Sequence, residues 1–382
     1  MVTTGKNKNQ QRLFGRAKRL KNNRCQYVKG NLMAQTYSNL FSQIYDFQNL
    51  FNAYLKARKN KRYNDDVLQF SAHLEENLIQ LQNELIYKTY EPGSYHEFYI
   101  YDPKTRLVMA APFRDRVLHH ALCNVIEPIF ERIFIYHSYA CRKNKGTHAG
   151  VKCTTDFLQR AARKHETVYC FKADVRKYFQ SINHGILKAV IRRKIACKDT
   201  LWLIDKIINS TVQEGENNPV GLPVGNLTSQ LFANLYLNEL DYFMKHAQRC
   251  ELYIRYMDDF LVLHPDKQYL KVLWRDAEDF LQTKLALNLN QKTAVFPIAQ
   301  GVDFLGYRIW THRKILRKSS VKRIKRIIKK FDQRHRAGTI KPDKIRAVLA
   351  SWLGHSSRAD VPVLREKILS AARELFGLKG LS

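Results

Sequence analysis

Three aspartates stand beside apolar runs that have the pattern of β-strands. Asp174 ends the run VYCFKAD, and Asp258 and Asp259 lie together inside ELYIRYMDDFLVLH. Two adjacent carboxylates in such a run repel each other and lose hydration, so a positive charge is needed to compensate them. A divalent cation would supply that charge, because carboxylate oxygens are ligands that Mg²⁺ takes in proteins.

The three carboxylates would form one site if the strands that carry them are neighbours in a sheet. Two Mg²⁺ ions roughly 3.5–4 Å apart can bind both the attacking and the leaving oxygen of a phosphoryl transfer. The alternative is that Asp258 and Asp259 only form a turn, since adjacent aspartates are common there. The apolar flanks and the third aspartate favour the metal site.

The spacing of apolar residues predicts the elements that must position these carboxylates. Helices are predicted over residues 64–88, 113–134, 199–213, 228–245 and 268–286, and strands or hairpins over 95–112, 168–174, 251–264 and 301–310. Basic helices are expected after about residue 313. Strands joined through hairpins and covered by helices indicate an α+β fold and not a doubly wound sheet.

A loop rich in turn-forming residues lies between the first aspartate and the pair. Residues 214–226 contain five Gly or Pro residues, and a long helix follows them. Gly225 lets the backbone approach a ligand closely, and the free N–H groups at the start of the helix can face a phosphate or a base. An ordinary loop and helix cap would have the same composition.

Basic residues at two further places have the chemistry to bind phosphate. Arg114 and Arg116 stand before an apolar helix, and each carries the planar fork that clamps a phosphate. Pairing of these guanidinium groups with nearby acids is the alternative. Arg142 and Lys145 lie beside Gly146 in a loop that either touches phosphates or is simply solvated.

The charge of the whole chain indicates a polyanionic partner. Its 382 residues include 65 Lys and Arg against 34 Asp and Glu, a net charge of +31, which is too large for an enzyme of neutral small molecules. Residues 1–45 contain no acid, and the predicted helix at 319–331 carries cations on one face, among them Lys322, Arg323, Lys325 and Arg326. A helix that binds a membrane surface has a similar pattern, but the aspartates favour nucleic acid.

Several classes of protein are not expected from this sequence. No apolar run is long enough to span a bilayer, and the N-terminus lacks the apolar core of a secretory signal. The seven cysteines include no CxxC pair, which predicts reduced thiols and no structural zinc.

Taken in order, these motifs resemble those of the reverse transcriptase family, over roughly residues 65–310. FKADVRKYF looks like the family's first palm motif, YMDD looks like its YxDD box, and GVDFLGY looks like its primer-grip strand. The resemblance implies that Asp174, the backbone carbonyl of Val175 and Asp258 hold two Mg²⁺ ions, for which Mn²⁺ can substitute. Asp259 is expected to be a further catalytic carboxylate and metal ligand, more peripheral than Asp258. The resemblance assigns the incoming dNTP to Arg114, Arg116, Phe179, Val224 and Gly225, and the protonation of pyrophosphate to Lys292.

The family has the right-hand polymerase fold, which implies fingers, a palm with an antiparallel sheet, and a helical thumb. The expected division is a basic N-terminal extension over 1–60, fingers over 61–167, a palm over 168–310 with 185–224 partly in the fingers, and a basic helical thumb over 311–382. The implied activity is RNA-directed DNA synthesis with template RNA, the RNA/cDNA duplex and dNTPs as partners. No nuclease or integrase domain is expected among the about seventy residues after the palm.

One motif departs from the common pattern of the family. Most members read QGxxxSP before the long helix, whereas this chain reads VGNLTSQ at 224–230. That variant resembles the reverse transcriptases of diversity-generating retroelements, which copy a template-repeat RNA and misincorporate opposite adenines. Val224 in place of Gln removes a hydrogen bond near the nascent pair. With Ser229 and Gln230 it defines the expected fidelity loop.

Three biological roles stay open from the sequence. A diversity-generating enzyme would work in the cytoplasm of a bacterial or phage-infected cell, with a small basic helical oligomer as its accessory protein. An antiphage-defence reverse transcriptase that copies a dedicated noncoding RNA shares the same variant. A non-catalytic, maturase-like RNA-binding protein is disfavoured, because it predicts that Asp174 or Asp258 is substituted, and both are present.

Overall fold

The computed structural model describes residues 35–101, 105–212 and 218–377. Most of the expected basic extension and the middle of the predicted segment 95–112 lie outside these ranges. The chain forms two compact units, each built from three separate segments. Unit 1 comprises 1–141, 174–251 and 275–291, and unit 2 comprises 142–173, 252–274 and 292–382.

Unit 1 is mainly helical and is organised around two long helices, α6 and α11. Its helices are α2 (Phe41–Tyr45), α3 (Phe47–Ala57), α4 (Asp65–Ala72), α5 (Leu74–Ile86), α6 (Phe113–Glu131), α8 (Tyr178–Ser181), α9 (His184–Arg192), α10 (Lys198–Asn209), α11 (Leu227–Tyr242) and the π-helical turn η1 (Phe243–Ala247). The helix α6 packs against α2, α3, α4 and α11. Twelve of the 16 residues of α11 are buried, including the polar Asn234, Asn238 and Asp241.

A two-stranded hairpin completes unit 1. It consists of β1 (His96–Ile100) and β2 (Arg106–Ala110), which pair antiparallel with Phe98 opposite Val108. Every residue of β1 is exposed, whereas most of β2 is half-buried. The strand β2 therefore faces the rest of unit 1.

Unit 2 contains a four-stranded sheet in the order β4-β5-β3-β6. Its strands are β3 (Tyr169–Asp174), β4 (Tyr253–Tyr256), β5 (Asp259–His264) and β6 (Ala294–Pro297). The helix α7 (Thr147–Lys164) packs on β4 and β5. On α12 (Lys267–Leu285), Trp274 stacks on Phe171 of β3, with 6.0 Å between ring centroids. Asp174, the last residue of β3, and the rest of α12 are counted with unit 1.

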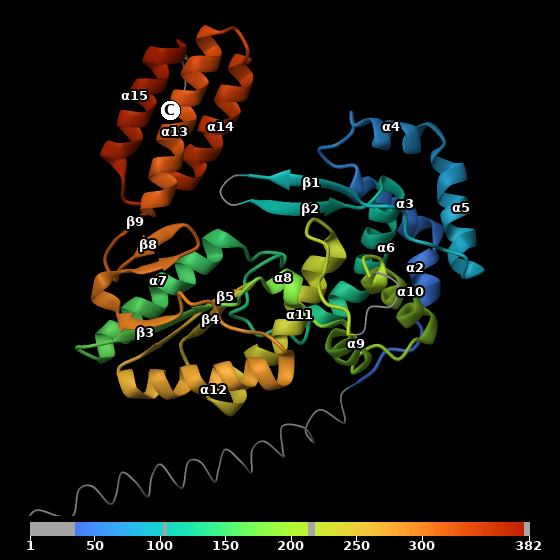
Figure 1. Ribbon diagram of the computed structural model, residues 1–382, viewed down its shortest axis with the longest axis horizontal. Coiled ribbons are helices and arrows are strands. Elements are labelled where there is room, and N and C mark those ends of the chain that lie inside the picture. The colour runs from blue at the N-terminus through green and yellow to red at the C-terminus, as the bar shows by residue number, and fades with distance from the viewer. Residues whose placement is uncertain (1–34, 102–104, 213–217, 378–382) are drawn as a thin grey trace, which may run out of the picture. The chain divides into compact units, whose positions relative to one another are not determined.

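A small sheet and three helices form the remainder of unit 2. The sheet runs β7 (Val302–Phe304), β8 (Tyr307–Ile309), β9 (Lys314–Leu316), and the helices are α13 (Lys318–Arg336), α14 (Pro342–Ser356) and α15 (Pro362–Phe376). Figure 1 shows the three helices side by side as a bundle. Tyr307 joins sheet to bundle, because its hydroxyl donates to the carbonyl of His355 at 2.7 Å.

The α+β class expected from the sequence is confirmed, but two predicted elements are interrupted. The helix predicted over 64–88 is divided at His73, whose φ of −123° and ψ of 48° are not helical. The strand predicted over 301–310 is the hairpin β7–β8, in which Phe304 pairs with Tyr307. Leu305 and Gly306, at φ of 52° and 89°, form its two-residue turn, and such turns need positive φ at both positions.

Candidate active site

The YMDD segment is a tight hairpin of unit 2. Tyr256 pairs with Asp259, so Met257 and Asp258 form a two-residue turn with Met257 at a φ of 55°. The side chain of Arg255 is fully buried, and its Nη1 donates to the carbonyl of Met257 at 2.9 Å. This hydrogen bond from a buried side chain stabilises the turn that contains Asp258.

Lys172 supplies positive charge to the second aspartate. Its Nζ lies 3.0 Å from Asp259 Oδ1 and 3.2 Å from Asp259 Oδ2. Both side chains are about three-quarters buried, with 22% and 25% exposed, so the pair is only partly screened by water. Sequence analysis missed Lys172, although side chains two residues apart share one face of a strand and Lys172 precedes Asp174 by two.

Asp174 is held by Asn290 within unit 1. The carbonyl of Asp174 accepts from the N–H of Asn290 at 2.7 Å, and Asp174 Oδ2 accepts from Asn290 Nδ2 at 3.2 Å. Val175 bridges Leu289 in an antiparallel manner. The two hydrogen bonds of this bridge use the carbonyl of Asp174 and the N–H of Arg176, and not the carbonyl of Val175. Asn290 was not predicted, because one Asn in LALNLNQKT carries no distinguishing signal.

The predicted dNTP residues Phe179, Val224 and Gly225 are brought together in unit 1 by the Gly- and Pro-rich loop. The N–H of Leu222 donates to the carbonyl of Phe179 at 2.8 Å, and the N–H of Met109 in β2 donates to the carbonyl of Val224 at 3.1 Å. Gly225 has a φ of 126°, and a Cβ there would lie 3.1 Å from Val108 Cγ1. The loop is therefore fixed between α8 and β2.

The two residues that complete the expected fidelity loop lie in the first turn of α11. Ser229 is buried and Gln230 is half-buried. Asn226, the N-cap residue of this helix, is also buried, and its Nδ2 donates to the hydroxyl of Tyr95 at 3.3 Å. These contacts make the start of α11 a rigid support for Val224 and Gly225.

Arg114 and Arg116 are engaged by acids of unit 1. Arg114 forms an ion pair with Glu84 and lies 3.6 Å from Asp115, and Arg116 forms an ion pair with Asp66. Burial lowers the pKa of Arg114 from its ordinary value. These contacts are what the ion-pair alternative predicts.

Arg106 is a further cation of unit 1. It is exposed at the start of β2, the strand that also contacts Val224. Among the residues that the structure describes, no acid pairs with it. The Arg106 guanidinium is exposed, whereas those of Arg114 and Arg116 are paired with carboxylates.

Comparison with protein-family models identifies the family of this chain. The family model described as "Reverse transcriptase (RNA-dependent DNA polymerase)" matches residues 100–309, which is more than half of the chain. The chain belongs to the reverse transcriptase family. Membership agrees with the right-hand polymerase class expected from the motifs.

Two curated relatives illustrate the range of similarity. The chain is 26% identical to Protein YkfC of Escherichia coli over 280 residues, covering 62% of this chain and 72% of YkfC. It is 27% identical to the Group II intron-encoded protein LtrA of Lactococcus lactis over 205 residues, covering 52% of this chain and 32% of LtrA. The match therefore spans only about a third of LtrA.

Solved telomerase structures share a weaker likeness. Apo telomerase from Candida tropicalis, truncated from its C-terminal domain, has a TM-score of 0.41 at 14% identity, covering 64% of this chain and 59% of that one. The full apo form has a TM-score of 0.43 at 14% identity, covering 63% and 53%.

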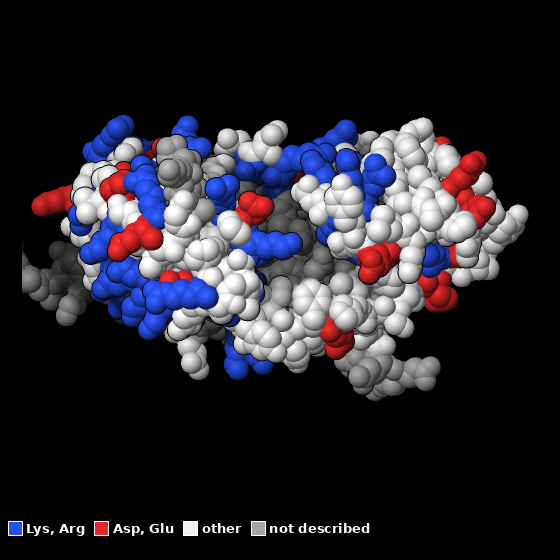
Figure 2. Space-filling view, turned by 90° about the horizontal axis from the view of Figure 1, so that it is seen from above, with Lys and Arg blue, Asp and Glu red and all other residues white. Residues whose placement is uncertain are grey.

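The predicted nucleic-acid residues of this reverse transcriptase lie in unit 2. The side chains of Lys322, Arg323, Lys325 and Arg326 on α13 are exposed, while Ile324 and Ile328 on the other face are buried. Arg142 and Lys145 form a turn at the start of α7, where Thr147 Oγ1 lies 3.2 Å from the hydroxyl of Tyr256 in YMDD. On the face shown in Figure 2, Lys and Arg cover more of the surface than Asp and Glu.

The side chains that could hold a metal ion are considered for the described part of the chain only. Within it, no cluster of three or more His, Cys, Asp or Glu side chains is arranged to hold an ion. The donor types do fit Mg²⁺, since Asp174, Asp258 and the Val175 carbonyl all offer oxygen atoms. Lys292 is exposed just before β6 and is counted with unit 2.

Two negative expectations concern the described residues alone. None of their helices is both long and apolar enough to cross a bilayer. Their six cysteines are free thiols, five of them buried and Cys141 exposed.

Proposed function

We propose that this member of the family is an active RNA-directed DNA polymerase. The observation that carries the proposal is the pinned YMDD turn, in which Arg255 holds the backbone and Lys172 neutralises Asp259. Asp258 lies at the tip of this turn and is the proposed carboxylate for metal binding. The strand β3, which ends at Asp174, is the sheet neighbour of β5, which begins at Asp259.

The proposed reaction joins a dNTP to the 3′ end of a primer. The primer 3′-hydroxyl attacks the α-phosphorus, a new P–O bond forms, and pyrophosphate leaves with the electron pair of the broken bond. Asp174, Asp258 and the Val175 carbonyl would hold two Mg²⁺ ions, which supply charge stabilisation to the attacking and leaving oxygens. Asp259, paired with Lys172, shapes the local field. Lys292 donates a proton to the leaving pyrophosphate.

The incoming dNTP is proposed to lie on the loop between α8 and β2. Phe179 closes the position of a ribose 2′-hydroxyl, and Gly225 keeps the loop clear of side chains. Among the cations predicted for the triphosphate, Arg114 and Arg116 would have to exchange their present acid partners. Arg106 is added to that set because no acid among the described residues pairs with it.

The test is primer extension on an RNA template by the full chain. Asp258→Asn and Asp174→Asn should each abolish extension while the affinity for the primer–template duplex stays within about two-fold. Asp279→Asn, an exposed carboxylate on α12, is the control and should retain full activity. Undiminished extension by either of the first two variants would refute the assignment.

The finer role that we propose is mutagenic copying of a template-repeat RNA, as in diversity-generating retroelements. Support comes from the VGNLTSQ loop, because Val224 presents an apolar side chain on a backbone fixed to β2. A small basic helical oligomer is the proposed accessory protein, and the cytoplasm of a bacterial or phage-infected cell is the proposed location.

Sequencing of cDNA made in vitro tests this finer role. Errors concentrated opposite template adenines are expected. Faithful copying of adenines would favour the defence enzyme with a dedicated noncoding RNA instead. An absence of any synthesis, with RNA binding intact, would favour the maturase-like protein.

A further inference from the structure

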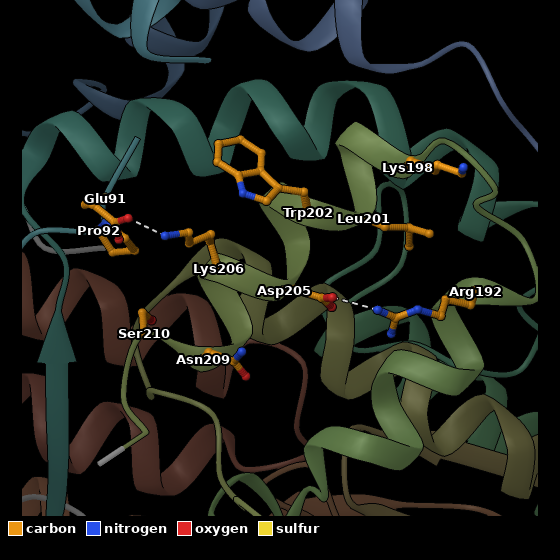
Figure 3. A pocket seen from close by; sticks show the side chains of 10 residues that line it. All are labelled: Glu91, Pro92, Arg192, Lys198, Leu201, Trp202, Asp205, Lys206, Asn209 and Ser210. Carbon is orange, nitrogen blue, oxygen red and sulfur yellow. Dashed lines mark hydrogen bonds and ion pairs between the residues drawn. The ribbon is translucent and has the colours of Figure 1, made fainter. Parts of the chain in front are cut away.

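A cavity of about 730 Å³ lies in unit 1. Its wall is formed by the end of α9, by α10 and by the segment before β1. The lining residues include Glu91, Arg192, Lys198, Trp202, Asp205 and Lys206. Figure 3 shows their side chains around the hollow, with the Trp202 indole on one side and Asn209 and Ser210 on the other.

Of the cations that line this cavity, two are paired with acids among the described residues and one is not. Lys206 pairs with Glu91, and Arg192 pairs with Asp205 at 2.6 Å, as the dashed lines in Figure 3 mark. Lys198, the first residue of α10, is exposed and has no acid partner within the described part of the chain. The cavity therefore carries one positive charge that no carboxylate offsets.

The indole of Trp202 gives the cavity an aromatic wall. It is half-buried, and its outer partner is Phe41 of α2, edge-on at 6.2 Å between centroids. An indole held in this way has little side-chain entropy left to lose on binding. Every nucleobase has a face that stacks on such a ring, whatever its sequence.

We propose that this cavity binds one nucleotide of a single-stranded nucleic acid, as a site separate from the proposed dNTP site. The base stacks on Trp202, Lys198 takes the phosphate, and the side chains of Asn209 and Ser210 meet the polar edge of the base. The volume is in the range of small-ligand sites, and the chain's net charge of +31 attracts any polynucleotide to its surface. This site goes beyond the proposed polymerase function, which does not use it.

The floor of the cavity is connected to the start of α11. Ser210 Oγ lies 2.8 Å from the hydroxyl of Tyr95, and that hydroxyl accepts from Asn226 Nδ2 at 3.3 Å. Asn226 is the residue directly after Gly225. A strand seated in the cavity would thus touch a hydrogen-bonded chain that ends beside the proposed dNTP site.

Site-resolved crosslinking with the full chain tests the proposal. Pentanucleotides of RNA and of DNA, each with one photoreactive thiopyrimidine, are bound, irradiated and digested, and the crosslinked peptides are identified by mass spectrometry. We expect crosslinks in the peptide that contains Trp202. Both strands would support the site, and the stronger would show which one it prefers. Crosslinks confined to other peptides for both strands would overturn it.

Affinities of variants give the second readout. Trp202→Leu should weaken pentanucleotide binding by about ten-fold, and Trp202→Phe should retain most of it. Lys198→Glu should weaken binding several-fold and reduce the salt dependence by about one phosphate contact. The matched charge control is Lys284→Glu, an exposed lysine of α12 in the same unit.

Two results would refute the nucleotide assignment. One is an affinity for Lys198→Glu equal to that of Lys284→Glu, a comparison that stays valid even if Trp202→Leu does not fold. The other is full competition by hexaglutamate at the concentration at which the pentanucleotide competes, which would show that the cavity reads charge alone.

Discussion

Lys172 Nζ lies 3.0 Å from Asp259 Oδ1, across two neighbouring strands of the sheet in unit 2. This ion pair gives the two aspartates of YMDD different surroundings. Asp259 begins β5 beside a cation, whereas Asp258 lies in the turn. Identical residue types at adjacent positions are in this way prepared for different tasks.

Lys172→Met should separate these tasks. Without the ammonium group, the electrostatic potential beside Asp258 becomes more negative. We therefore expect tighter Mn²⁺ binding, measured by electron paramagnetic resonance, and slower primer extension. The free energy of unfolding should fall by about 1 kcal/mol, as for a partly exposed pair. Lys172→Arg keeps the charge and should resemble the wild type. Equal Mn²⁺ affinity in the Met and Arg variants would show that Lys172 does not act on the metal ligands.

Val224→Gln should raise fidelity opposite template adenines. The carbonyl of Val224 is bonded to Met109, so the backbone stays in place and the variant adds only an amide near the nascent pair. One net hydrogen bond corresponds to about ten-fold in discrimination. The measurement is deep sequencing of cDNA, with Val224→Ile as the apolar control. An error rate shared by both variants would contradict the loop account.

Gly225→Ala should displace the loop from β2. A φ of 126° is strained for alanine, and its Cβ would press on Val108 Cγ1 at 3.1 Å. We expect a loss of about 1–3 kcal/mol in unfolding free energy and a large rise in the KM for dNTP. Gly354→Ala is the control, because a Cβ there meets no atom within 4 Å. Similar KM values for the two variants would show that the close approach has no functional role.

Tyr95→Phe should destabilise the start of α11. The change removes the hydroxyl that accepts from buried Asn226 and bonds Ser210. An amide left without that partner costs about 1–3 kcal/mol, which chemical denaturation can measure. Tyr87→Phe, at a side chain that is 74% exposed, should cost almost nothing. If the two costs are equal, the hydroxyl of Tyr95 carries no net stabilisation.

His119 should make the fold sensitive to acid. Burial lowers its pKa from 6.5 to about 3, so the unfolded chain binds a proton that the folded chain refuses. The stabilisation is complete above about pH 6.5 and is lost as the pH falls below it, by up to about 1.4 kcal/mol per pH unit. The unfolding temperature should therefore fall less steeply between pH 7 and pH 5 for His119→Gln than for the exposed control His73→Gln.

The sequence was sufficient for features that depend on nearby residues. The hairpin around Asp258, the helix predicted over 113–134 and the amphipathic α13 follow from short-range patterns, and all are present. The partners of charged groups did not follow. Lys172 meets Asp259 through sheet order, and Arg116 meets Asp66 of α4 from far along the chain. The division of 301–310 was missed because Leu305, and not only a glycine, adopts positive φ.

Neither unit is a continuous piece of the chain, since each is assembled from three segments that alternate along it. During synthesis β3 leaves the ribosome long before β6, although Tyr169 must pair with Pro297. An unpaired edge of this kind invites pairing with other chains. A shortened chain that stops ahead of β6 would keep that edge open, so expression of the YMDD region by itself should yield aggregates.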